Sequence, residues 1–322
     1  MDLNILLSRW ENISKFEEKK GFKALRITYS SIPDLFIALD EDGFRYLLLY
    51  LPSALEIKIK ETNKDKLNLE YLKDGNIISI KLNDLNFKDL FNDLIISLYN
   101  KIKDISDPII YSKTLIQTFY KWSEFFDNHF QSKLSPEEIK GLFGEIWLLN
   151  TYLERADPST INEFLDSWKG PYNTTNDFVF DQKNLEVKTK EDSKSFISIS
   201  SEYQLERELD KALELIVLSV KLDILNGESI YDLLKITVDY VRENFGDLTT
   251  LFRALSQKGL TIESSTQYNN FRFLVSGLSS YDCCHDDFPK LSTSNIPNEI
   301  SNLRYDLRTS MLNKFLIKES NF

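Results

Sequence analysis

The pattern of hydrophobic residues changes near Pro108, and this change limits the folds open to the chain more than any other feature. Before it, short apolar segments alternate with turn signals such as Asp40-Glu41-Asp42-Gly43 and Lys73-Asp74-Gly75-Asn76, which are typical of hairpins. Residues 86–103 then have the spacing of an amphipathic helix. We therefore predict that residues 1–104 form an N-terminal antiparallel β domain closed by a helix. The expected strands are 23–28, 35–39, 44–51, 55–60, 67–72 and 77–82.

Helical spacing follows Pro108, first over residues 109–126 and then from Pro136. Ser135 as N-cap and Glu138 three residues later predict a capping box at the second start. The order that follows is helix, three short strands, helix and a long apolar strand, which predicts an α/β (α+β) domain with an αβββαβ core. We place this core at 136–222 within a domain of residues 105–322. Its expected elements after the first helix are strands 177–180, 185–189 and 196–200, a helix beginning over 201–209, and strand 213–222; helices 229–244 and 248–257 and strands 272–278 and 303–307 follow.

Two carboxylates and a lysine gather in one predicted hairpin. If Asp181-Gln182 forms a two-residue loop, Asp177 lies directly opposite Glu186, with Cβ atoms about 4.5–5.5 Å apart. Lys188 shares that face because side chains alternate along a strand. The other face is then entirely apolar, with Phe178, Phe180, Leu185 and Val187. The hairpin is therefore expected to pack a core on one side and to present ionisable groups on the other.

Acidic side chains this close repel each other unless a cation lies between them. Oxygen ligands at this spacing suit Mg²⁺ or Mn²⁺, and Lys188 could then orient or deprotonate an attacking water. The chain has only two histidines and two adjacent cysteines, Cys283 and Cys284, which leaves no material for a zinc site of the usual kinds. The composition therefore directs the search for a metal site to carboxylates.

A bland explanation stands beside the catalytic one. Charged residues make up 28% of the chain, so Glu-x-Lys triplets arise by chance, as in Glu56-Ile57-Lys58, Glu138-Ile139-Lys140 and Glu17-Glu18-Lys19. On spacing alone, a solvated strand face with a cross-strand Glu–Lys pair is the more frequent meaning of such a triplet. The same two interpretations apply to polar residues nearby, which either contact a phosphate backbone or are simply solvated. These residues are Lys183, Lys190, Lys194, Ser198 and Ser200.

The charge of the whole chain argues against a cationic coat for nucleic acids. Its 39 Lys and Arg against 50 Asp and Glu give a net charge of −11. Nonspecific DNA affinity comes mostly from Lys and Arg, so binding would need a locally positive cleft or a partner protein. No apolar run approaches the ~20 residues that span a bilayer, and the first residues lack the pattern of a signal peptide. We expect a soluble cytoplasmic protein without a membrane partner.

Several short motifs together give the chain a resemblance to a known family. They are Gly141-Leu142-Phe143-Gly144-Glu145, Trp168-Lys169-Gly170-Pro171, Asn176-Asp177-Phe178-Val179-Phe180, Leu185-Glu186-Val187-Lys188-Thr189, Ile197-Ser198-Ile199-Ser200 and Gln204-Leu205. In this order they resemble the PD-(D/E)XK nuclease superfamily. The closest resemblance is to a bacterial family of PD-(D/E)XK motif proteins, several of which lie near restriction or phage-defence genes. The resemblance is strongest over 136–205 and implies a restriction-endonuclease-like core.

The resemblance also implies roles for the residues of the hairpin. Asp177 and Glu186 match the metal-binding acids, and the main-chain carbonyl of Val187 would be a further metal ligand. Lys188 matches the catalytic lysine. Since relatives that have lost activity lose an acid or the lysine, this chain is expected to be an active nuclease.

Two positions outside the hairpin match as well. Glu145 corresponds to a helix glutamate that helps to hold the metal or water, and Gln204 corresponds to an accessory position on the helix after the strands. One departure is Asn176, which stands where the motif has proline.

The expected function is that of a Mg²⁺-dependent (or Mn²⁺-dependent) endonuclease that hydrolyses DNA in a bacterial restriction or anti-phage defence system. RNA is an alternative substrate, because it would be cleaved by the same metal chemistry. A defence-system partner protein and a homodimer are expected as possible partners. The rival hypothesis is a non-catalytic binding or scaffolding subunit of a defence complex that keeps the nuclease fold; the acidity of the chain favours it.

Overall fold

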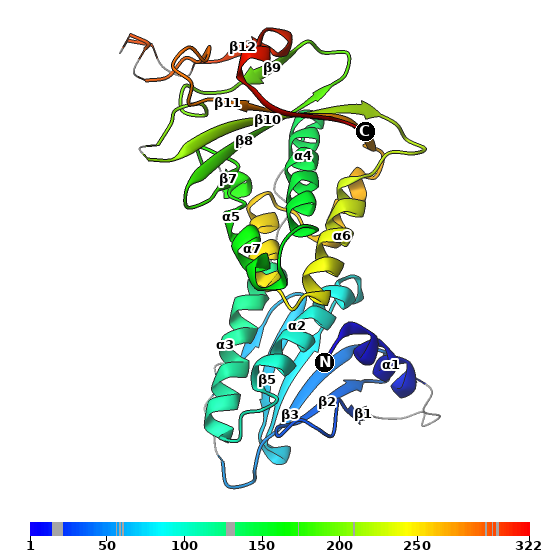
Figure 1. The fold of residues 1–322 in the computed structure, drawn as a ribbon. Helices are drawn as coiled ribbons and strands as arrows, with labels where there is room; N and C mark the ends of the chain where they lie inside the picture. The colour runs from blue at the N-terminus through cyan, green and yellow to red at the C-terminus, as the bar shows by residue number, and fades with distance from the viewer. Residues whose placement is uncertain are drawn as a thin grey trace. The chain divides into compact units, whose positions relative to one another are not determined.

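The computed structural model describes residues 1–14, 22–55, 57, 59, 61–126, 133–172, 174–208, 210–293, 295–297, 299–300 and 303–322. The chain divides into two units, Met1–His129 and Phe130–Phe322, and each is described by itself (Figure 1). The strand expected at 55–60 falls partly outside the described residues. Its described members, Leu55, Ile57 and Ile59, are not in a strand.

Six strands of the first unit form one antiparallel sheet in the order β1-β2-β3-β6-β5-β4. Their bounds are β1 Lys23–Arg26, β2 Asp34–Leu39, β3 Arg45–Tyr50, β4 Thr62–Asn63, β5 Leu67–Leu72 and β6 Ile77–Leu82. The expected strands 67–72 and 77–82 coincide with β5 and β6. Asn76, in the turn between them, has a φ of 51°, a left-handed conformation that asparagine adopts more readily than most residues. The sequence signal for this hairpin is confirmed.

The two faces of this sheet are packed differently. Leu35, Leu49 and Ile78 lie in register across β2, β3 and β6 and are fully buried on the face covered by helices α1 (Leu3–Ser14) and α2 (Lys88–Ile102) (Figure 1). The opposite face carries a smaller cluster that includes Tyr46 and Leu48. One sheet face buried under helices is the arrangement expected for an antiparallel domain.

Helix α1 is an element that the sequence interpretation did not include. Leu6, Trp10 and Ile13 form its buried stripe, at spacings of four and three residues. The indole N–H of Trp10 donates to Oδ1 of Asn92 at 2.9 Å, and the guanidinium of Arg45 lies 4.5 Å from the centre of the Trp10 ring. The spacing of these three residues could therefore have predicted the helix, although the stripe is short.

Helix α3 (Pro108–Phe126) lies in the first unit, whereas the sequence placed the domain boundary at 104/105. It packs along α2, and the rings of Phe87 and Phe126 are 5.9 Å apart. Pro108 begins this helix, and Asp107 accepts from the backbone N–H of Ile109. Proline suits the first turn of a helix, because its missing N–H would have no helical partner there.

The second unit contains a five-stranded mixed sheet in the order β13-β11-β10-β8-β7 and a two-stranded sheet of β9 and β12. Strands β8 and β10 are parallel, and the other neighbours are antiparallel. The strand bounds are β7 Phe178–Val179, β8 Lys183–Glu191, β9 Phe196–Ile199, β10 Ala212–Leu222, β11 Phe273–Asp282, β12 Tyr305–Arg308 and β13 Leu316–Asn321. The helices are α4 Pro136–Leu153, α5 Ile161–Ser167, α6 Ile230–Glu243, α7 Leu248–Gln257 and α8 Ile262–Ser265. The mixed α/β class is confirmed.

Strand β10 shows how the layers stack. Leu213, Leu215 and Val217 on one face join a core with β9 and β12, whereas Leu218 on the other face lies under Gly144 of α4. The five-stranded sheet is thus covered by α4 on one side and by the β9–β12 pair on the other (Figure 1). The capping box of α4 is present as expected, with Ser135 and Glu138 bonded to each other's backbone N–H.

The αβββαβ order is not reproduced in two respects. Strand β9 pairs with β12 and is separate from the main sheet, and the described residues 201–208 form turns instead of the expected helix. The side chain of Asn176 donates to the main-chain oxygen of Gln204, and the side chain of Gln204 accepts from the N–H of Ser200. These side-chain bonds compete with helical backbone pairing and hold the chain in a turn.

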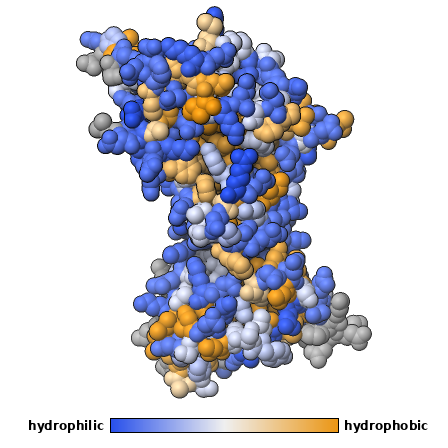
Figure 2. Space-filling model, viewed as in Figure 1, coloured by the Kyte–Doolittle hydropathy of each residue, from blue (hydrophilic) through white to orange (hydrophobic). Residues whose placement is uncertain are grey.

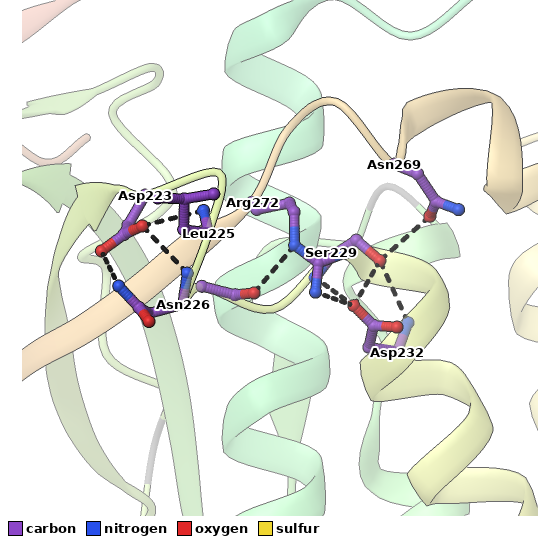
Figure 3. A network of polar contacts seen from close by, with 8 residues as sticks. Asp223, Leu225, Asn226, Ser229, Asp232, Asn269 and Arg272 are labelled. Atoms are coloured by element: carbon purple, nitrogen blue, oxygen red, sulfur yellow. Dashed lines mark hydrogen bonds and ion pairs between the residues drawn. The ribbon is translucent and has the colours of Figure 1, made fainter.

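The turn after β10 is tied to the start of α6 and β11 by a polar network (Figure 3). Asp223 accepts from the N–H groups of Leu225 and Asn226, and Ser229 and Asp232 form the capping box of α6. Arg272 pairs with Asp232 at 3.0 Å. A Cβ on Gly227 would lie 2.5 Å from the carbonyl oxygen of Asp223 and 2.8 Å from the backbone of Phe273, so only glycine fits there.

The two glycines of α4 make a matched pair for testing the contact between α4 and the sheet. A Cβ on Gly144 would collide with the hydroxyl of Thr189 and lie 3.2 Å from its Cβ, whereas a Cβ on Gly141 meets nothing within 4 Å. We expect Gly144→Ala to lower the free energy of unfolding by about 1–3 kcal/mol through overpacking. Gly141→Ala should raise it by about 0.5–1 kcal/mol through helix propensity. Urea denaturation of both variants measures the difference, and equal effects would contradict the packing seen at Thr189.

None of the helices in the described part of the chain is long and apolar enough to cross a bilayer. Hydrophilic residues cover most of the face shown in Figure 2, with hydrophobic ones scattered among them.

Candidate active site

The six residues named from the sequence come together around one cleft. This cleft has a volume of about 600 Å³, and every residue that lines it belongs to the second unit. Its lining includes Glu145, Asp177, Glu186, Val187, Lys188 and Gln204. Helix α4, strand β8, the segment before β7 and the turn after β9 each contribute to it.

The hairpin has the register expected from its loop. Phe178 is the partner of Leu185, and the N–H of Phe180 donates to the carbonyl of Lys183 at 2.9 Å. Continuing this register places Asp177 opposite Glu186, and the N–H of Asp177 donates to the carbonyl of Leu185. Phe178 and Leu185 are fully buried, as predicted for the apolar face.

The Asp177 carboxylate is held by backbone groups. Its Oδ2 accepts from the N–H of Val187 at 2.8 Å. Its main-chain oxygen accepts from the N–H groups of Lys169 and Gly170, at 2.7 and 2.9 Å. These bonds keep the carboxylate of Asp177 beside strand β8. Its other oxygen, Oδ1, lies close to Gly170.

Glu186, Lys188 and Gln204 form a chain of polar contacts. Glu186 is only 1% exposed, and its Oε1 lies 2.6 Å from Nζ of Lys188. Nζ also donates to Oε1 of Gln204 at 3.1 Å. Gln204 therefore reaches the site from a turn rather than from the helix that was expected, and it orients the lysine between two acceptors.

Glu145 approaches the same acids from helix α4. The buried indole N–H of Trp168 donates to its Oε2 at 2.8 Å. Gly170 lies against both carboxylates, since a Cβ there would collide with Oε2 of Glu145 and come within 2.9 Å of Oδ1 of Asp177. Trp168 thus aims the glutamate, and Gly170 leaves the space that the acids occupy.

The three acids resist ionising together. Burial, followed by the charge of Asp177, raises the pKa of Glu186 to about 8, although Lys188 opposes the shift. Burial and the same charge raise the pKa of Glu145 to about 8. The pKa of Asp177 is raised by burial against the lowering effect of the Val187 N–H. Converging carboxylates of this kind favour a bound cation.

The cleft offers only a few oxygen atoms that could bind a divalent cation directly. Among the described residues, no group of three or more His, Cys, Asp or Glu side chains is arranged to hold one ion. Asp177 and Glu186 with a main-chain carbonyl remain, and Mg²⁺ commonly keeps several waters beside one or two carboxylates. Because Oε2 of Glu145 already accepts the hydrogen bond from Trp168, we do not count Glu145 among the direct ligands. These residues fit a hydrated Mg²⁺ or Mn²⁺ site.

Other predicted residues have mixed outcomes. Lys190, Lys194, Ser198 and Ser200 line the cleft, whereas Lys183 pairs with Glu214 outside it. The competing triplet Glu138-Ile139-Lys140 is structural, because Glu138 caps α4 and Lys140 pairs with Glu191 at 2.9 Å. The triplets Glu17-Glu18-Lys19 and Glu56-Ile57-Lys58 contain residues outside the described part of the chain.

Sequence reasoning missed Lys258, which lines the cleft from the end of α7. It lies more than 50 positions from any other lining residue, and no local pattern marks it. Its charge lowers the pKa of Glu145 and of Asp177.

The acid cluster predicts an unusual dependence of stability on pH. The folded protein retains a proton on Glu186 between pH 4.5 and about 8, where the unfolded chain has released it. The free energy of unfolding should therefore fall as the pH rises through this window, by up to about 1.4 kcal/mol per pH unit for one such group. We expect the melting temperature of the wild type in EDTA to fall more steeply with pH than that of Glu186→Gln.

Added Mn²⁺ should flatten this slope in the wild type, since the cation favours the ionised acids. The expected rise in melting temperature at pH 8 is about 4 °C or more, and little rise is expected at pH 5. Glu214→Gln, at a carboxylate outside the cleft, is the control. Parallel slopes for wild type and Glu186→Gln would contradict the retained proton.

Comparison with known proteins gives one family. A family model described as "Putative PD-(D/E)XK family member, (DUF4420)" matches residues 6–310. A search of curated proteins and one of solved structures each gave no match. The match extends over both units and includes every residue of the hairpin site. With this geometry and this coverage, the chain belongs to the DUF4420 family of PD-(D/E)XK proteins.

Proposed function

We propose that this protein is a Mg²⁺-dependent or Mn²⁺-dependent endonuclease that hydrolyses DNA phosphodiester bonds. The observation that carries the proposal is the convergence of Asp177, Glu186 and Lys188 in one cleft, with the two acids opposed across a hairpin. The other Glu-x-Lys triplet that the structure describes in full has a structural role instead. Family membership supports nuclease-like chemistry.

Each residue would have a distinct task. Asp177 and Glu186, with the carbonyl of Val187, would hold the cation, which supplies Lewis-acid stabilisation and a more acidic bound water. Glu145, aimed by Trp168, would bind water at the edge of this group. Lys188 would orient the attacking water and offset negative charge on the phosphoryl oxygens. Gln204 would position the ammonium, to which it is already bonded.

The rival function is a non-catalytic binding or scaffolding subunit. One contact favours it: the ammonium of Lys188 lies 2.6 Å from Oε1 of Glu186 and competes with a cation for that oxygen. The net charge of −11 also weakens intrinsic affinity for DNA. We propose that a partner protein of a bacterial restriction or anti-phage system brings the chain to DNA, in the cytoplasm, and that cleavage of both strands would use a homodimer.

The test is incubation with plasmid DNA, a single-stranded oligonucleotide and RNA, in Mn²⁺, Mg²⁺ or EDTA. Metal-dependent fragments that disappear with Glu186→Gln support the nuclease. Fragments that persist in EDTA or with Glu186→Gln would indicate a contaminating enzyme. No cleavage of any substrate, together with no Mn²⁺ binding by calorimetry, would favour the scaffolding role.

A further inference from the structure

We propose that the outer face of the two-stranded sheet of β9 and β12, here called the β9–β12 ribbon, binds a single strand of nucleic acid beside the cleft. Arg304 and Arg308 would contact phosphates, and a base would stack on Phe196. This inference rests on the proposed nuclease function, whose substrate it describes.

Strand β9 separates its side chains cleanly between two environments. Ile197 and Ile199 are buried in the core beneath the ribbon, whereas Phe196 and Ser198 are exposed. Phe196 retains 37% of its surface exposed, although large aromatic side chains are usually covered. The outer face of β9 is therefore free to meet a ligand.

The register adds two guanidinium groups to this face. Arg308 is the partner of Phe196, and Asp306 is the partner of Ser198. Continuing the same register by one residue places Arg304 opposite Ser200. Directly opposed residues point to the same side of an antiparallel pair. Arg304, Asp306 and Arg308 are all exposed, in agreement with this placement.

The ribbon is continuous with the candidate active site. Phe196, Ser198 and Ser200 line the same cleft as the acids, together with Lys190 and Lys194. Lys190 donates from Nζ to the carbonyl of Lys194 at 3.0 Å, so this bond closes the turn between β8 and β9 that carries both lysines. A strand whose scissile phosphate lies at Glu186 would therefore meet the ribbon within the same cleft.

Basic side chains gather at the ribbon, although the chain as a whole is acidic. Within the described residues, neither Arg304 nor Arg308 has an ion pair, and Lys190 and Lys194 lie nearby in a chain of net charge −11. Asp306 opposes this patch, and its carboxylate accepts from the hydroxyl of Ser198 at 2.7 Å. Arg304, Arg308, Lys190 and Lys194 outnumber this one carboxylate, and cations are the groups that contact phosphates.

An exposed aromatic ring among cations favours a single strand. Bases in a duplex stack on each other, whereas unpaired bases stack on aromatic side chains with little regard to sequence. Phe196 follows the turn that carries Lys190 and Lys194 and is the register partner of Arg308, so a phosphate chain bound by these cations would bring a base to the ring.

The test measures binding separately from cleavage. Glu186→Gln protein is titrated, in EDTA, against a fluorescein-labelled oligothymidylate and against a duplex, and anisotropy gives the dissociation constant over a range of salt. Arg304→Ala/Arg308→Ala in this background should weaken single-strand binding about threefold to tenfold and lower the salt slope by about 1.4. Lys235→Ala/Lys318→Ala is the control of equal charge, because these exposed residues do not line the cleft.

Two further substitutions sharpen the assignment. Phe196→Leu should weaken single-strand binding by at least about fivefold with little effect on the duplex. Asp306→Asn should strengthen binding, since it removes the opposing charge. Thermal unfolding of each variant checks that the fold is kept.

The outcomes separate this surface from the nuclease proposal. An unchanged dissociation constant for the double arginine variant, or no single-strand binding by Glu186→Gln protein at about 100 µM, overturns the surface even if the wild type cleaves DNA. Equal losses on single strand and duplex with Phe196→Leu overturn the single-strand assignment. Weaker binding by both variants, with no cleavage by the wild type, supports the surface and removes the nuclease.

Discussion

Glu186→Gln is expected to reduce metal-dependent cleavage by about 10³-fold or more, because the substitution removes the charge of a proposed metal ligand while keeping its shape. The fold should survive. The carboxyl group is buried beside Asp177, and burial and that neighbouring charge already disfavour its ionised form. In EDTA at pH 8 the variant should therefore melt no lower than the wild type. Lost activity with retained stability is the signature of a functional carboxylate.

The control for this substitution is Glu214→Gln. Glu214 lies on the neighbouring strand β10 and pairs with Lys183 at 3.4 Å, outside the cleft. The Glu214→Gln variant should cleave DNA at the rate of the wild type. Initial rates on plasmid DNA at saturating Mn²⁺ give the comparison, and full activity of Glu186→Gln would remove this residue from the site.

Lys188→Met is expected to separate catalysis from metal binding. Loss of the ammonium should slow cleavage by about 10²–10⁴-fold, the range for a group that assists proton transfer or charge stabilisation. The same change removes the ammonium that lies 2.6 Å from Oε1 of Glu186, so Mn²⁺ should bind more tightly than to the wild type. Methionine keeps the length of the side chain in its half-buried position, which limits the damage to packing.

Calorimetry with Mn²⁺ and single-turnover cleavage measure the two effects. Gln204→Leu is an informative companion, because it removes the acceptor that holds Nζ at 3.1 Å but leaves the ammonium in place. It should slow cleavage less than Lys188→Met. A weaker affinity for Mn²⁺ in Lys188→Met would contradict competition between the lysine and the cation for Glu186.

The hairpin of the site could be predicted in detail because its determinants are local. A two-residue loop and alternating side chains decide which residues face each other, so Asp177 and Glu186 were correctly paired from residues within ten positions. The capping box of α4 was predicted for the same reason. Both depend on bonds between neighbours in the chain.

Elements whose form depends on distant contacts were predicted less well. The segment after β9 was expected to begin a helix, but the side chain of Asn176 donates to the main-chain oxygen of Gln204, and the side chain of Gln204 accepts from the N–H of Ser200, which holds the segment in a turn. Strand β9 was expected as one of three successive strands of the αβββαβ core, yet its partner, β12, lies about 100 residues later. In each case a tertiary contact outweighed a local preference.

By itself, the sequence determined which residues make up the candidate site: two acids in register and a lysine on their face, in a chain whose few histidines and cysteines leave carboxylates as the side chains for the proposed metal site. Only the tertiary structure decided how the acids are tuned and what surrounds them. Trp168 aims Glu145, Gly170 makes room for both carboxylates, and Lys258 arrives from a distant helix. Alternation along a strand is a property of neighbouring residues, whereas burial and electrostatic fields arise from segments that meet only in the folded chain.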